Sequence, residues 1–217
     1  RMQSKPRETN VFIADWIEGD KTEIAQPKTL KKHISYLSSD ELQGRLTGSV
    51  GEKKAAAYIV KEFKSLGLKP YANKSYLQTF NYKVKINPHS TDASSDKANS
   101  GTNVIAFLDN KASKTIVIGA HYDHLGLNEH NHSSKPNSHG EIHNGADDNA
   151  SGVAAVLELA RMFSQNKTKE NVNYLFALFS GEEDGLIGSK HMAETLKNLY
   201  PNVVTMINLD MIGRLDK

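Results

Sequence analysis

The stretch TIVIGAHYDH, residues 115–124, is an apolar run of six residues followed at once by four polar ones. Short apolar runs rich in β-branched residues are typical of strands that lie in a sheet covered on both faces. Similar runs occur at Asn103–Leu108, Asn173–Phe179 and Val203–Asn208. The sequence therefore predicts a buried central sheet that contains these four strands.

Segments with helical spacing of apolar residues alternate with these runs. We expect helices over Thr29–Ser38, Gly51–Leu66, Ser151–Phe163 and Ile187–Leu199. Alternation of strands and helices favours an α/β fold. The predicted architecture is a three-layer αβα sandwich around a mixed, mostly parallel central sheet.

A different pattern precedes the first buried run. Apolar residues alternate from Leu77 to Ile86, which predicts a further strand, and the Ser/Asp/Lys-rich stretch Thr91–Gly101 predicts a surface loop. We expect residues 1–27 to form an N-terminal arm and residues 28–217 to form one domain.

Composition excludes several classes of protein. With 27 basic and 25 acidic residues the net charge is +2, so no basic surface for nucleic acid is expected. No apolar run reaches the length of a membrane-spanning helix. The absence of cysteine excludes disulfides and thiolate zinc ligands.

Histidine and acidic residues cluster beside the predicted strands. His121 and Asp123 follow one strand directly, Glu182 and Glu183 follow another, and Asp210 follows the last. The pair Asp147-Asp148 precedes the helix that is predicted to begin near Ser151. Ligands of open α/β sheets bind outside the carboxyl ends of the strands, and imidazole with carboxylate suits zinc or a similar divalent ion.

Each cluster alone has a simpler interpretation. A single histidine after a strand is usually a surface residue, and two adjacent acids at a helix start usually cap that helix. However, Glu182 and Glu183 lie side by side at a strand end, where a cation would offset their repulsion. Four such clusters at one edge of a sheet favour a metal centre.

Five histidines fall in the segment between Asp123 and Asn144: His124, His130, His132, His139 and His143. A histidine-rich tract can form a metal site of its own. The irregular spacing favours the other interpretation, a mobile segment at the rim of the active site.

Several motifs occur in a characteristic order: Ser39–Arg45, Gly119–His124, Asn144–Gly152, Ser180–Ser189 and Ile207–Asp210. Together they resemble the zinc aminopeptidase family that includes aminopeptidase Y and bacterial leucyl aminopeptidases. Glutamate carboxypeptidase and glutaminyl cyclase are relatives of that family. The resemblance extends from about Leu37 to Arg214 and makes residues 28–217 a zinc peptidase domain.

The resemblance implies two zinc ions. His121 and Asp210 would bind the first zinc, Glu183 would bind the second, and Asp148 rather than Asp147 would bridge both.

The resemblance also implies the roles of two further carboxylates. Glu182 would be the general base, and Asp123 would orient the His121 ring. A cis peptide bond would join Asp148 to Asn149. The implied function is a secreted or periplasmic aminopeptidase acting on peptide substrates.

One family ligand has no counterpart in its expected place. The second zinc of the family takes a histidine from a loop beyond the equivalent of Asp210, and this chain ends seven residues after Asp210. We therefore expect a domain truncated at its C-terminus, with a poorly occupied second site and no activity. Exposure of the strand Val203–Leu209 would favour self-association.

Two alternative functions remain open. A glutaminyl cyclase, which is an acyltransferase on the same scaffold, needs a single zinc and would fit the missing ligand. A non-catalytic receptor-like module is the other alternative, although the intact set of acidic residues and His121 disfavours it. The preferred N-terminal residue of a substrate cannot be deduced from these motifs.

Overall fold

The computed structural model of the chain describes residues 25–72, 75–84, 97–130, 132–167, 169–200 and 202–214. Its helices are α1 (Pro27–Leu37), α2 (Val50–Ser65), α3 (Gly152–Gln165) and α4 (Ile187–Leu199), with the short helical turns η1 (Asp40–Arg45) and η3 (Ala146–Ser151). Its strands are β1 (Lys69–Pro70), β2 (Leu77–Val84), β3 (Lys97–Leu108), β4 (Thr115–His121), β5 (Asn173–Phe179) and β6 (Val203–Asn208).

The described strands form one six-stranded sheet in the order β1-β3-β5-β4-β6, with β2 also paired to β3. Strand β4 is parallel to β5 and to β6, whereas β3 is antiparallel to β1, β2 and β5. Five of these strands therefore run in one direction and β3 runs against them. The predicted mixed, mostly parallel sheet is confirmed in this sense.

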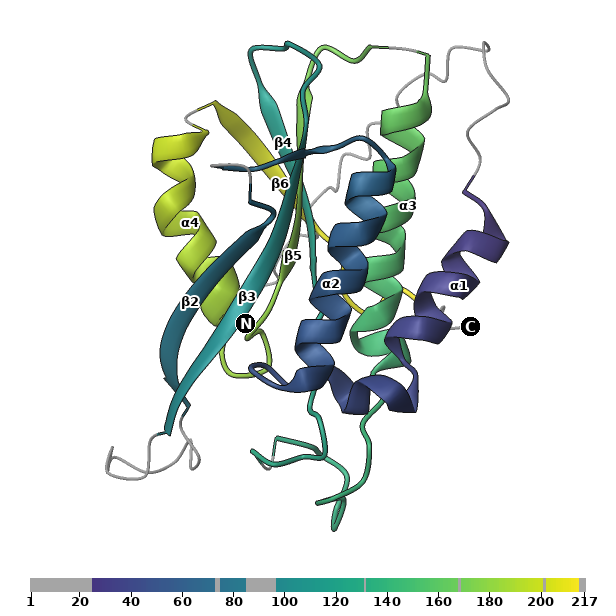
Figure 1. Cartoon of the computed structure of the whole chain (residues 1–217), viewed down its shortest axis with the longest axis vertical. Coiled ribbons are helices and arrows are strands. Elements are labelled where there is room, and N and C mark those ends of the chain that lie inside the picture. The colour runs from purple at the N-terminus through teal and green to yellow at the C-terminus, as the bar shows by residue number, and fades with distance from the viewer. Residues whose placement is uncertain are drawn as a thin grey trace, which may run out of the picture.

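Helices cover both faces of the sheet (Figure 1). Helices α1, α2 and α3 lie on one face and α4 lies on the other. Two apolar cores result, because alternate residues of one strand point to opposite faces. Ile118 and Ala120 of β4 belong to the core under α2 and α3, and Val117 belongs to the core under α4 with Met192. The predicted α/β sandwich is confirmed.

Local sequence signals account for the ends of α2. The Ser49 side chain accepts a hydrogen bond from the Glu52 backbone N–H, which satisfies a donor of the first turn. Gly67 has a φ of 70°, a left-handed conformation that ends a helix without steric cost in glycine. The structure places this helix at Val50–Ser65, one residue earlier than predicted.

The prediction that Thr91–Gly101 form a surface loop is wrong for residues 97–101. Residues 97–101 belong to β3 and pair with residues 80–84 of β2. Most of these residues are exposed, although their partners Phe80 and Val84 in β2 are buried. Polarity there reflects exposure and not irregular structure. Residues 91–96 and the predicted strand end at Ile86 lie outside the described residues, as do residues 1–24 of the predicted arm.

Strand β6 forms one edge of the described sheet. Its Val204, Met206 and Ile207 side chains are about half exposed, which agrees with the exposed apolar surface expected for this segment. Self-association through it stays a prediction. Among the described residues, no helix is both long and apolar enough to cross a membrane.

Candidate metal centre

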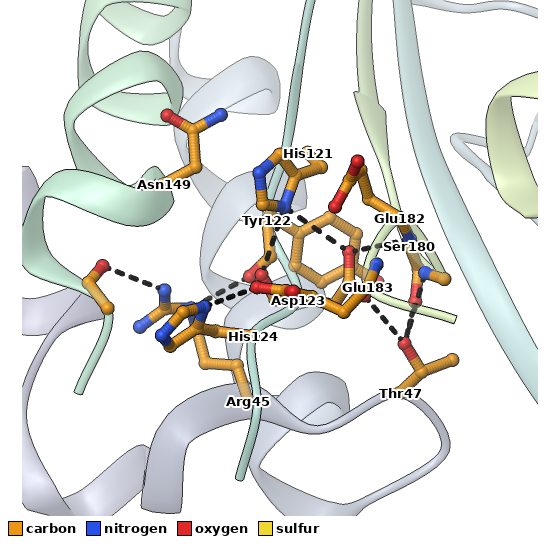
Figure 2. Close-up of polar contacts among 12 residues, drawn as sticks. Arg45, Thr47, His121, Tyr122, Asp123, His124, Asn149, Ser180, Glu182 and Glu183 are labelled. Carbon is orange, nitrogen blue, oxygen red and sulfur yellow. Dashed lines mark hydrogen bonds and ion pairs between the residues drawn. The ribbon is translucent and has the colours of Figure 1, made fainter. Parts of the chain in front are cut away.

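The candidate site lies at the carboxyl ends of the parallel strands. His121 ends β4, and it pairs in register with Phe179, which ends β5. Glu182 and Glu183 follow β5 after two residues, and Asp210 follows β6 after one. Figure 2 shows the side chains of His121, Glu182 and Glu183 gathered beside this edge.

A first group of ligand atoms surrounds the His121 ring. Its Nε2 lies 3.1 Å from Asp148 Oδ1 and 3.5 Å from Asp210 Oδ1. Its Nδ1 lies 3.2 Å from the backbone carbonyl oxygen of Asp123, which can only accept a hydrogen bond. Nδ1 therefore carries a proton, and Nε2 faces the two carboxylates, so Nε2 is the ring nitrogen that would bind a metal ion.

A second group lies beside the first. His124 Nδ1 is 2.5 Å from Glu183 Oε1 and 3.9 Å from Asp148 Oδ2. The ligand atoms of these three residues all lie within 4.8 Å of one another. His124 was not among the metal ligands predicted from the sequence. In the sequence, its position three residues after His121 was the feature that could have indicated a role in metal binding.

Asp148 joins the two groups. Its Oδ1 faces His121 and its Oδ2 faces His124, so one carboxylate presents an oxygen to each group. The peptide bond between Asp148 and Asn149 is cis, as predicted. The Asn149 side chain donates to the Leu209 carbonyl oxygen and accepts from the Met211 N–H, which fixes the segment that carries Asp210.

The neighbouring Asp147 points elsewhere. Its Oδ1 accepts a hydrogen bond of 2.8 Å from the Gly213 N–H, and its Oδ2 lies 3.2 Å from Arg214 Nε. Of the two adjacent aspartates, Asp148 is the one that lies among the potential ligands.

Asp123 is fully buried and connects β4 to the segment after β5. Its carboxylate lies 3.6 Å from His121 Nδ1 and accepts hydrogen bonds from the backbone N–H groups of Glu182 and Glu183. Thr47 donates to it at 3.0 Å. Asp123 thus fixes the position of both strand ends.

Carboxylates outnumber cations around the two groups. Burial alone would lower the pKa of His121, but hydrogen bonds to Asp123 and Asp148 raise it to about 11. The hydrogen bond from His121 in turn lowers the pKa of Asp148. A set of imidazole nitrogens and carboxylate oxygens that binds a proton this strongly also fits a divalent cation such as zinc.

Glu182 lies beside these groups, and its carboxylate forms a further group of potential ligands with His121 and Glu183, whose ligand atoms all lie within 4.8 Å of one another. Burial raises its pKa, Glu183 and other nearby carboxylates add to the increase, and His121 opposes it. Glu182 and His121 line a pocket of about 220 Å³ whose other walls include Phe179, Leu186 and Met206. The pocket can receive an apolar group directly next to the Glu182 carboxylate.

Arg45 is a further residue of the site for which the sequence predicted no role. Its side chain is 1% exposed, and its guanidinium donates to the carbonyl oxygens of Tyr122, Leu37, Asn144 and Gly145. Burial lowers its pKa to about 10 while nearby carboxylates oppose the change, so it is charged at neutral pH. Arg45 therefore holds η1, the end of β4 and the segment before η3 together beneath the site (Figure 2).

Comparison with known proteins identifies the family. Residues 103–217, more than half of the chain, match Peptidase family M28. The chain belongs to peptidase family M28. The resemblance deduced from the sequence motifs is confirmed.

Curated proteins are similar to parts of this chain. A probable zinc metalloprotease of Pyrenophora tritici-repentis is 43% identical over 97 residues, 45% of this chain and 20% of the relative. The alkaline phosphatase isozyme conversion protein of Escherichia coli is 33% identical over 194 residues, 87% of this chain and 51% of the relative. The chain thus spans from a fifth to half of the length of these relatives. The family match and the name of the first relative place the chain in a family of zinc metallopeptidases.

Solved structures of the M28 fold are similar as well. A glutaminyl cyclase of Fimbriiglobus ruber has a TM-score of 0.68 at 22% identity and covers 88% of this chain and 63% of its own. A leucine aminopeptidase precursor of Bacteroides thetaiotaomicron has a TM-score of 0.67 at 18% identity, covering 87% and 63%. At this identity the similarity establishes the fold.

Proposed function

We propose that this M28 chain carries the active site of a two-zinc aminopeptidase. The observation that supports two metals is the shared carboxylate, because each Asp148 oxygen faces a different histidine. Glutaminyl cyclases share the fold and need a single zinc, so the second ligand group favours the peptidase.

The residues fall into two ligand groups. His121, Asp148 and Asp210 would hold one zinc, and His124, Asp148 and Glu183 would hold the other. Each group then offers three protein ligands, which is the number that catalytic zinc sites generally use. Zinc bound there would supply Lewis-acid chemistry that polarises a carbonyl group and lowers the pKa of water.

The chain's own residues supply proton transfer and positioning. Glu182 accepts a proton from the attacking water and returns a proton to the leaving amine. Asp123 keeps His121 and the Glu182 backbone in their relative positions. The pocket lined by Phe179, Leu186 and Met206 receives the side chain of the N-terminal residue. An extracytoplasmic location belongs to the same proposal and follows from the family resemblance alone.

This proposal differs from the sequence-based prediction that the second zinc site is incomplete. The family resemblance implied that the third ligand of the second zinc site comes from beyond Lys217. In this proposal His124, which lies beside Glu183, takes that place. The proposal therefore no longer requires that the 217-residue chain be inactive.

The function can be tested on aminoacyl anilides. The purified protein should release the anilide from substrates with a free amino group and leave the matched N-acetylated substrates intact. Metal analysis should give two zinc ions per chain at the proposed centre, and chelation should abolish activity. Cyclisation of peptides with N-terminal glutamine, without anilide release, would instead support a cyclase. Zinc binding with neither reaction would contradict an enzymatic function.

His124 gives a separate test. Replacing it with alanine should release one zinc per chain, because one of three ligands in its group is lost. The loss of affinity should exceed the ~10–100-fold effect of removing an outer-shell partner of a metal ligand. The matched control is His139→Ala, which changes an exposed histidine of the same segment. Unchanged zinc content in the His124 variant would show that the second ion takes its histidine from elsewhere.

A further inference from the structure

A third group of potential ligands lies outside the metal centre. His130 Nδ1 is 2.9 Å from Asp184 Oδ1, and His132 Nδ1 is 3.8 Å from the same oxygen. The two imidazole rings lie 5.7 Å apart between centroids. Two histidines of the segment after β4 thus converge on an acid 52 positions beyond His132 in the chain.

The chemistry of this group suits a metal ion. Its three ligand atoms all lie within 4.8 Å of one another. Two imidazole nitrogens and one carboxylate oxygen are a donor set that zinc uses when a fourth position is left for water. Imidazole donors also suit cobalt and nickel, whereas calcium and magnesium prefer oxygen ligands.

The two histidine side chains are more exposed than the Asp184 side chain, so an ion could reach the group from the solvent. The Asp184 side chain is 3% exposed, whereas those of His130 and His132 are 18% and 22% exposed. The carboxylate is therefore fixed inside the protein, and the two imidazoles lie between it and the solvent.

A hydrogen-bond chain orients the carboxylate. The Tyr82 hydroxyl donates to Asp184 Oδ2, and Asn99 Nδ2 donates to the Tyr82 oxygen at 2.9 Å. Tyr82 lies in β2 and Asn99 in β3. The other oxygen, Oδ1, is left to face the two histidines. Partners of this kind behind a ligating carboxylate orient it and strengthen metal binding.

The group is separate from the two groups at the metal centre. Glu183 and Asp184 are adjacent, yet Glu183 contacts His124 while Asp184 contacts His130. Among the described residues, the third group shares no residue with any of the groups at the metal centre. We propose that His130, His132 and Asp184 bind a zinc ion of their own, which fastens the histidine-rich segment to the β2–β3 hairpin.

This site answers the question that the sequence left open. The histidine tract was expected to form a mobile rim of the active site, with a separate metal site as the alternative. The convergence on Asp184 favours the alternative. The proposal rests on this group alone and does not depend on the peptidase activity.

Zinc titration of the chelator-treated protein tests the site. The double variant H130A/H132A should bind one zinc ion fewer per chain than the wild-type protein. The control His139→Ala, in the same segment, should bind as many as the wild type. Circular dichroism should establish that each variant is folded. A double variant that binds as many ions as the wild type would overturn the proposal.

A second variant separates this site from the metal centre. The Asp148 variant, made as Asp148→Asn together with His121→Ala, disrupts every ligand group of the centre, and it should still bind one zinc ion. Adding Asp184→Asn, which keeps the side-chain shape, should abolish that remaining binding. Cobalt(II) in place of zinc should show an absorption band in the Asp148 variant that disappears with the second change. If the Asp148 variant binds no ion, the third site does not exist, whatever the activity of the wild type.

Discussion

Replacing Glu182 with glutamine should lower anilide turnover by about a hundredfold or more and leave the zinc content unchanged. Glutamine keeps the size and the hydrogen-bonding shape of the side chain but cannot accept a proton. Glu182 shares a group of potential ligands with His121 and Glu183, but the two groups built around Asp148 keep all their ligands in this variant, so the zinc content should stay the same. Steady-state kinetics together with metal analysis of the same preparation would check both statements.

Glu183→Gln provides the matched comparison. Its carboxylate lies 2.5 Å from His124, so the variant should lose zinc as well as activity. If the Glu182 variant lost zinc and the Glu183 variant kept it, the two assignments would have to be exchanged. Wild-type turnover in Glu182→Gln would remove it from the role of general base.

Replacing Arg45 with methionine should lower the free energy of unfolding by several kcal/mol, because each buried acceptor left without a donor costs about 1–3 kcal/mol. Methionine fills a similar volume but donates no hydrogen bond. Four carbonyl oxygens, those of Leu37, Tyr122, Asn144 and Gly145, would then lose a buried donor. Urea unfolding at a fixed zinc concentration would measure the change.

Two controls bracket the Arg45 effect. Arg45→Lys keeps the charge but not the planar array of donors, so an intermediate loss of stability is expected. Lys54→Met removes an exposed partner of Glu41 and should change stability by less than ~1 kcal/mol. A change in Arg45→Met no larger than that of the Lys54 variant would show that water replaces the guanidinium.

The strongly patterned elements were predictable from sequence. β5, β6 and α4 have the predicted bounds, because their apolar residues are dense and their ends are marked by polar or turn residues. The start of β3 was missed, since a polar stretch of strand in an exposed hairpin has the composition of a loop. Composition reports burial more directly than it reports backbone conformation.

The candidate site was predictable to a similar degree. His121, Glu183 and Asp210 could be brought together because the carboxyl ends of parallel strands meet at one edge. His124 could not be placed, since the direction of a side chain beyond a strand end depends on the following turn. Arg45 was missed because its partners are backbone carbonyl groups, which leave no trace in the sequence.

The spacing of the proposed ligands along the chain has a consequence for folding. An unfolded chain cannot hold together ligands that are spread from residue 121 to residue 210, namely His121, His124, Asp148, Glu183 and Asp210. Any zinc bound by this set would therefore favour the native state selectively. A free zinc concentration one hundred times the dissociation constant would contribute about 2.7 kcal/mol to folding. The zinc concentration around the protein would then affect the stability of the fold as well as the activity.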